Sequence, residues 1–383
     1  YKSSKEPQIL TIKNKLDSIE STVDPPPKQM VQLSRNQIKS QVDPPPPKIF
    51  DKGGGFVEIS SKNYLKRANI AGVSLNGGTL LLDPRDIYVR DSSKSGYTLT
   101  SNLSAVDSFN DGTNALYQVN SSTIETALTA GTNVILQARQ DIFVQSDIIA
   151  TGSSGGDLTL NAGVDIEISA DITTANGDLN LIANNASVTS RGTDQSDIDV
   201  TSTLNLGSGD LNITLGNVSS GDSNNVHLGL ATINANNITL TDSGTGSNTS
   251  RVSVLGDLNA SSAINVTSTN KRVNVGSASL TANGTGTAVD ITSKYLSGNG
   301  GSVSTPNGIW RAINTDTSSN GARFGGFTGN FIQYGYSSGD AIQGTGSGLL
   351  SAYNPGNLTR IYNVFSSTSY HLTKEYDGTN STA

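Results

Sequence analysis

Residues 156–185 read GDLTLNAGVDIEISADITTANGDLNLIANN, and this stretch decides the fold. Apolar and polar residues alternate in it, as in the segments 158–160 (LTL) and 166–168 (IEI), so the apolar side chains share one face of a short strand. A strand this short cannot bury its apolar side chains by itself, because a single neighbouring strand would cover only part of them. The pattern therefore predicts that copies of the unit stack on one another.

A repeated phrase supports the same prediction. Gly-Asp-Leu begins at Gly156, Gly177, Gly209 and Gly256, so the intervals are 177 − 156 = 21, 209 − 177 = 32 and 256 − 209 = 47 residues. A period of about 20–25 residues, made of short strands and polar turns, is typical of a solenoid. The interval of 47 fits two turns, and that of 32 fits one turn with an excursion. We predict an all-β fold, a right-handed parallel β-helix.

The predicted core follows from the alternation. Thr159, Asn180 and Asn212 should point outward, and a slip of one residue would invert every position. The residues predicted to point inward are Leu158, Leu160, Ile166, Ile168, Leu179, Leu181, Leu211, Ile213 and Leu215.

Composition agrees with a thin core and excludes some partners. Of 383 residues, 34% are hydrophobic and 15% are charged, which is low for an enzyme with one thick core. The net charge of −7 argues against nucleic acid as a partner, and no run of 18 apolar residues is present in the sequence. The absence of cysteine suits a cytosolic protein and also a chain that crosses an outer membrane unfolded. Because the chain begins at Tyr1 without a signal peptide, we read it as a mature fragment.

Residues 1–50 form a Pro-rich segment unlike the rest. The phrases VDPPPK (23–28) and VDPPPPK (42–48) each follow apolar residues at helical spacing, the second of them around Val31. Proline runs end helices and favour polyproline II, so an extended or helical segment is expected. We expect this segment to act either as a linker or as a docking ligand.

The β-helix is predicted to run over 51–300, with an excursion between Asp91 and Gly131 that includes a helical turn at 122–130. No aromatic residue lies between Val144 and Lys294, which suits a narrow, evenly stacked core. Aromatic residues return in 301–373, where they would form either a cap over the open end of the helix or a carbohydrate-binding platform. The cap residues in question are Trp310, Phe324, Phe327, Phe331, Tyr334 and Tyr336.

Several phrases together resemble one family. GGFVEIS at 54–60 is followed by GTLLLDPRDI at 78–87, and TPNGIW, FGGF and KEYDGT occupy 305–310, 324–327 and 374–379. On these phrases the chain resembles the exoproteins of two-partner secretion, the filamentous-haemagglutinin-like adhesins. Residues 374–383 look like the start of a YDG-type repeat domain. The N-terminal secretion domain of that family is not visible here.

The resemblance implies a secreted protein of the bacterial cell surface, a rigid rod for attachment or biofilm formation. It implies an outer-membrane secretion partner of the two-partner type, a host or matrix glycan or protein as ligand, and self-association. Two other functions on the same scaffold remain open: a β-helical polysaccharide lyase or hydrolase, and a capture protein for a host haem carrier. A lyase would show Asp or Glu clustered with Lys, Arg or His on one face of successive coils, which the sequence alone does not display.

Few residues are candidates for catalysis or metal binding, and we predict no enzyme activity, catalytic site, metal site or cofactor. His227 and His371 lie far apart, and neither has a carboxylate nearby in the sequence. Residues 152–156 match G-x-S-x-G, but a strand rather than a helix follows. The pairs Asp83/Asp86 and Asp197/Asp199 could bind calcium or serve a lyase, and solvated carboxylates are the expected interpretation.

Overall fold

The structure, a computed structural model, places the chain in two compact units. Unit 1 comprises residues 1–195 and 202–209, and unit 2 comprises residues 196–201 and 210–383; each is described by itself. The structure describes residues 9–10, 30–32, 56–60, 78–83, 86–91, 116–185, 196–216, 224–229, 231–244, 251–318, 327–354 and 360–362.

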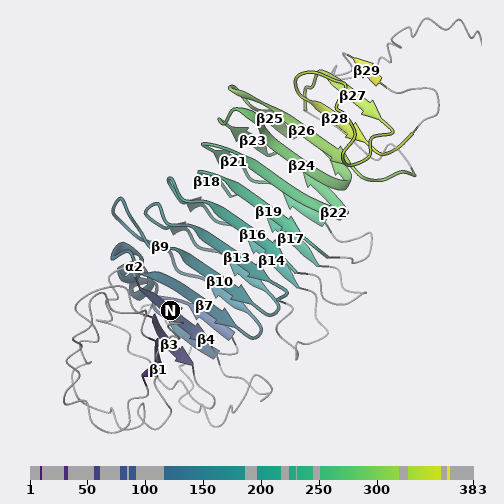
Figure 1. Ribbon diagram of the computed structural model, residues 1–383. Coiled ribbons are helices and arrows are strands. Elements are labelled where there is room, and N and C mark those ends of the chain that lie inside the picture. Colours follow the sequence, from purple (N-terminus) through teal and green to yellow (C-terminus); the bar gives the residue numbers. More distant parts are fainter. Residues whose placement is uncertain are drawn as a thin grey trace, which may run out of the picture. The chain divides into compact units, whose positions relative to one another are not determined.

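Unit 1 is a stack of parallel strands with three strands in each full coil (Figure 1). Its first face runs through β1 (Ile9–Leu10), β2 (Met30–Gln32), β3 (Phe56–Ser60), β4 (Thr79–Asp83), β7 (Asn133–Ala138), β10 (Leu158–Ala162) and β13 (Leu179–Ala183). The second face holds β5 (Asp86–Val89), β6 (Leu116–Val119), β8 (Ile142–Val144) and β11 (Ile166–Ile168). The third holds β9 (Ile148–Ile149), β12 (Ile172–Thr173) and β15 (Leu204–Asn205).

Unit 2 repeats this arrangement. Its first face contains β16 (Leu211–Leu215), β19 (Ile238–Asp242) and β26 (Gly308–Asn314); its second contains β14 (Asp197–Val200), β17 (Asn225–Leu228) and β20 (Arg251–Val254). The long strands β22 (Ile264–Val275) and β24 (Gly286–Ser297) run through both faces. The third face contains β18 (Ile233–Ala235), β21 (Leu258–Ala260), β23 (Ser279–Ala282) and β25 (Ser302–Ser304).

The strands stack in register, so the core is a set of columns of like side chains. Leu158 of β10 pairs with Val134 below and with Leu179 above, and Leu160 continues the neighbouring column. All nine residues predicted to point inward are at most 1% exposed, while Thr159, Asn180 and Asn212 are half-buried. The predicted all-β parallel solenoid and the predicted strand register are thus confirmed.

Each residue of the Gly-Asp-Leu phrase has its own structural role. A Cβ on Gly177 would lie 2.6 Å from the carbonyl carbon of Gly156 in the coil below, so only glycine fits. The Asp carboxylate accepts a hydrogen bond from the backbone of the next coil, as Asp157 does from the Asp178 N–H at 2.9 Å. The Leu enters the core. The repeat therefore encodes close contact between coils, a corner hydrogen bond and core packing.

The C-terminal part of unit 2 buries aromatic rings. β28 (Gly348–Ser351) pairs with β26 and with β27 (Phe331–Tyr334), and β29 (Arg360–Tyr362) runs antiparallel to β27. Trp310, Phe327 and Phe331 are at most 2% exposed, and the Trp310 Nε1 donates to the Thr328 carbonyl at 3.0 Å. The burial of these three rings fits a cap over the end of the β-helix better than an exposed carbohydrate-binding platform. Tyr334 and Tyr336 are half-exposed, and Phe324 lies outside the described residues.

Two local expectations need correction. The helical turn expected at 122–130 is a nine-residue helix, α2 (Ser121–Thr129), because Ile124 and Leu128 pack into the core one turn apart. The helical spacing around Val31 does not produce a helix there, since Val31 lies in β2 and pairs with Val57 of β3. The Pro-rich phrases of residues 1–50 lie outside the described residues.

Candidate functional site

One outer face of unit 2 carries charged and polar side chains on successive strands. On β14 and β17, Asp197 is in register with Asn225, and Asp199 with His227. On β20, Ser253 is the register partner of His227. Side chains at these alternate positions point away from the core, because Val226, Leu228 and their neighbours fill it. We call Asp197, Asp199, Asn225, His227, Arg251 and Arg272 the polar face.

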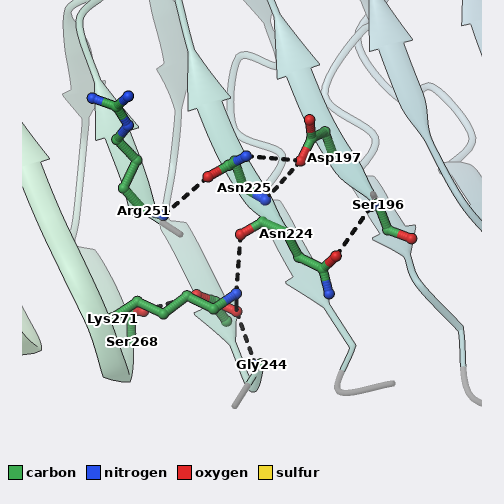
Figure 2. Close-up of polar contacts among 9 residues, drawn as sticks. Ser196, Asp197, Asn224, Asn225, Gly244, Arg251, Ser268 and Lys271 are labelled. Carbon is green, nitrogen blue, oxygen red and sulfur yellow. Dashed lines mark hydrogen bonds and ion pairs between the residues drawn. The ribbon is translucent and has the colours of Figure 1, made fainter. Parts of the chain in front are cut away.

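A hydrogen-bonded chain crosses the polar face from strand to strand (Figure 2). The backbone N–H and the Nδ2 of Asn225 both donate to Asp197 Oδ1, at 2.7 and 3.1 Å. The Arg251 N–H donates to Asn225 Oδ1 at 3.1 Å. Burial raises the pKa of Asp197, against the opposing effect of the Asn225 hydrogen bonds. A proton on Asp197 is therefore retained to a higher pH than on an ordinary aspartate.

Asp199 and His227 form a contact that the sequence did not reveal. Asp199 Oδ1 lies 3.1 Å from His227 Nδ1, and the two side chains are 43% and 41% exposed. No carboxylate lies beside His227 in the sequence, but the fold brings Asp199 next to it. The residues are 28 positions apart, and only the parallel register of β14 and β17 brings them together. A carboxylate on Nδ1 orients an imidazole and leaves its Nε2 for another partner.

Two arginines complete the polar face. Arg251 and Arg272 are register partners on β20 and β22, and both are exposed. Like charges directly opposite each other destabilise a sheet, so a pair of guanidinium groups here costs stability. Tyr295 of β24 is the next register partner, and a hydrogen bond with Asp316 raises the pKa of its phenol. Guanidinium pairs bind carboxylate and sulfate groups well because each presents a planar fork of donors.

The polar face therefore has the arrangement that the sequence did not display: acids, an imidazole and guanidinium groups on one face of successive coils. The successive intervals, from Asp197 to Asn225, from Asn225 to Arg251 and from Arg251 to Arg272, are 225 − 197 = 28, 251 − 225 = 26 and 272 − 251 = 21 residues, and no short motif joins them. A sequence signal existed only in the alternation of each strand. The unequal turns between the strands concealed which residues meet.

The other predicted residues take structural places. Residues 152–154 form an exposed turn between β9 and β10, so the G-x-S-x-G match has no strand-to-helix elbow. Asp86 is 6% exposed, and its Oδ1 accepts a hydrogen bond from the Asp141 N–H at 3.4 Å. This carboxylate is therefore buried at a corner between coils and is not solvated, contrary to the expectation. Asp83 ends β4, with its side chain outside the described part. His371 also lies outside it.

A second polar cluster is enclosed rather than exposed. Lys271 and Asp242 form an ion pair with Nζ and Oδ1 3.0 Å apart, and their side chains are 0% and 1% exposed. Ser268 donates to Asp242 Oδ2 at 2.8 Å, and Lys271 Nζ also donates to the Asn224 carbonyl at 3.1 Å (Figure 2). No sequence pattern predicted this cluster, because a lysine among polar residues is normally solvated.

Comparisons with known proteins returned nothing similar: no family model, curated protein or solved structure matches the chain. Within the described residues, no group of three or more His, Asp or Glu side chains is placed to hold a metal ion. No helix in the described part is long and apolar enough to cross a membrane.

Proposed function

We propose that this chain is a segment of a secreted bacterial cell-surface adhesin, a stiff solenoid that acts in attachment or biofilm formation. The observation that carries the proposal is the in-register stacking of parallel coils, with one layer of apolar side chains inside and polar columns outside. The phrases at 54–60 and 78–87, which resemble those of two-partner-secretion exoproteins, support it. An outer-membrane partner of that type would export the chain.

A stack of this kind suits such a role physically. Each coil adds about 4.8 Å along the stack, so length grows in proportion to the number of coils. Among the described strands of each unit, neighbouring coils are joined by parallel strand pairing, which resists bending. A folded coil also presents a template to the next one, so folding outside the cell can proceed coil by coil.

The polar face is the proposed contact surface for a host or matrix glycan. Carboxylates and amides accept and donate hydrogen bonds to sugar hydroxyls, and the two guanidinium groups pair with acidic sugars. The test uses inert beads coated with the purified chain, and counts beads retained on cultured host cells and on immobilised acidic glycans. The Arg251→Ser, Arg272→Ser double variant should lose retention. The control, Thr214→Ser, alters an exposed position on a different face.

Retention equal to that of uncoated beads would contradict the adhesin proposal. Retention that is unchanged in the double arginine variant would leave the adhesin proposal standing and remove the polar face as its contact surface. A parallel binding assay with host haem carriers tests the remaining scaffold-based alternative. Specific, saturable binding of a haem carrier, with no retention on cells, would favour that alternative.

A polysaccharide lyase or hydrolase is the second candidate, and one observation favours it: Asp197, Asp199 and His227 lie together beside Arg251. Our prediction is still that the chain has no activity. Purified chain should release no reducing or unsaturated ends from pectin, alginate or glycosaminoglycans, with or without calcium. Turnover that disappears in Asp197→Asn or Asp199→Asn would establish the enzyme instead.

A further inference from the structure

The enclosed pair of Lys271 and Asp242 joins two neighbouring coils of unit 2. Asp242 is the last residue of β19, and Lys271 lies in β22 where the pairing shifts between Ser268 and Arg272. The two residues are 29 positions apart, and their Nζ and Oδ1 atoms lie 3.0 Å apart. Neither side chain is accessible to solvent beyond 1%. An amine and a carboxyl group are thus held in contact away from water.

Fixed partners hold both reacting groups. The Ser268 hydroxyl donates to Oδ2 of Asp242 at 2.8 Å, and the Gly244 N–H donates to Oδ1 at 3.0 Å. Lys271 Nζ is held from the other side by the Asn224 carbonyl at 3.1 Å. The space around the amine depends on Gly244, because a Cβ there would lie 2.8 Å from Lys271 Cε. The site is therefore built around the pair.

We propose that Lys271 and Asp242 condense to form an intramolecular isopeptide bond. A proton passes within the ion pair, which gives a neutral amine and a carboxylic acid. A bond forms between Nζ and Cγ, and the bond between Cγ and Oδ2 breaks. Oδ2 leaves as water with two of the three protons of the original ammonium group. Oδ1 stays as the amide oxygen and keeps its hydrogen bond from Gly244, and no further reactant is needed.

Three features of the site favour condensation. Holding the two groups in contact makes the reaction intramolecular, and effective concentrations in well-oriented cases reach about 10⁵–10⁸ M. Enclosed charges carry a desolvation penalty, which a neutral amide removes for both groups at once. The Ser268 hydroxyl already donates to the oxygen that departs, and so stabilises negative charge on it as it leaves. Once formed, the amide is shielded from hydrolysis by its burial.

The bond would tie β19 to β22 covalently. Strand pairing alone can separate coil by coil when a solenoid is pulled, whereas a covalent link cannot open. This inference stands on the geometry of the pair and does not depend on the adhesin proposal. For an adhesin under tension, however, a locked coil would stop unzipping at this point.

Intact-mass spectrometry of the full chain tests the proposal. The folded chain should weigh one water molecule less than its sequence, and the Lys271→Arg variant, which keeps the positive charge, should have the full mass. A tryptic digest should contain one branched peptide that joins the segments holding Asp242 and Lys271. Cleavage after Lys271 should be absent, because trypsin requires a free side-chain amine there.

Succinimide formation at an aspartate also removes water, so hydroxylamine serves as the control: it opens a succinimide and leaves an amide intact. The measurement on the unaltered chain does not depend on whether the variant folds. A folded chain at its full sequence mass after prolonged incubation would overturn the proposal. A water loss that persists in Lys271→Arg, or that hydroxylamine reverses, would do the same.

Discussion

Gly177 gives the sharpest test of how the coils fit together. In Gly177→Ala the new Cβ would lie 2.6 Å from the carbonyl carbon of Gly156 and 3.1 Å from the carbonyl oxygen of Gly155. Ordinary contacts between carbon atoms are about 3.5–4.0 Å, so this corner must open by about 1 Å. The obstructing atoms are backbone and cannot rotate away. The coil itself has to move.

The cost follows from what the movement disrupts. Two hydrogen bonds join the coils beside Gly177: Leu158 N–H to the Asp178 carbonyl at 2.8 Å, and Asp178 N–H to Asp157 Oδ1 at 2.9 Å. Each is worth about 1 kcal/mol net, and an overpacked site costs about 1–3 kcal/mol more. We therefore expect Gly177→Ala to lower the free energy of unfolding by about 4 kcal/mol.

Urea denaturation followed by far-ultraviolet circular dichroism measures this loss. Ser153→Ala is the matched control, since Ser153 is exposed in the neighbouring turn and contributes only its backbone carbonyl to Asn176. The control should change the free energy of unfolding by less than about 0.5 kcal/mol. Amide hydrogen exchange should also accelerate at Leu158 in Gly177→Ala. A loss under about 1 kcal/mol would refute the close-contact account of the Gly-Asp-Leu phrase.

Three further predictions concern the core, the pH dependence and the cap. Leu179→Asp should lower the free energy of unfolding by several kcal/mol in urea titrations, because it places an unpaired charge in a fully buried position; unchanged stability would argue against the core assignment. Burial raises the pKa of Asp290 above its ordinary 3.8, so the folded chain holds this proton more tightly than the unfolded chain does. The contribution of Asp290 to stability therefore falls as the pH rises from 3.8 through the raised pKa. Urea midpoints measured at a series of pH values should show this fall, and the Asp290→Asn variant should flatten it. Trp310, the single tryptophan, is 2% exposed, so iodide should leave its fluorescence unquenched until the chain is unfolded, and strong quenching of the native chain would contradict the cap.

Much of the fold could be predicted because it depends on patterns among residues that are close together in the sequence. Alternation of apolar and polar residues assigns each side chain to the inside or outside of a strand, and the residues of 156–185 show that alternation directly. The spacing of the Gly-Asp-Leu phrase indicated a repeat of about one coil. The structure then showed what its glycine and carboxylate contact in the neighbouring coil. A helix as long as α2 was harder to predict, because one short apolar pattern is compatible with a single turn or with several.

The candidate site could not be predicted, because it depends on which coils meet. Asp199 and His227 are 28 residues apart, Lys271 and Asp242 are 29 apart, and the turns between their strands differ in length. Sequence alone therefore determined the all-β stacked architecture and the inward columns of apolar side chains. Only the tertiary structure decided the pairing of Asp199 with His227, the line of arginines beside them and the enclosure of Lys271. Side-chain direction repeats every two residues along a strand, whereas contacts between coils depend on the length of every intervening turn.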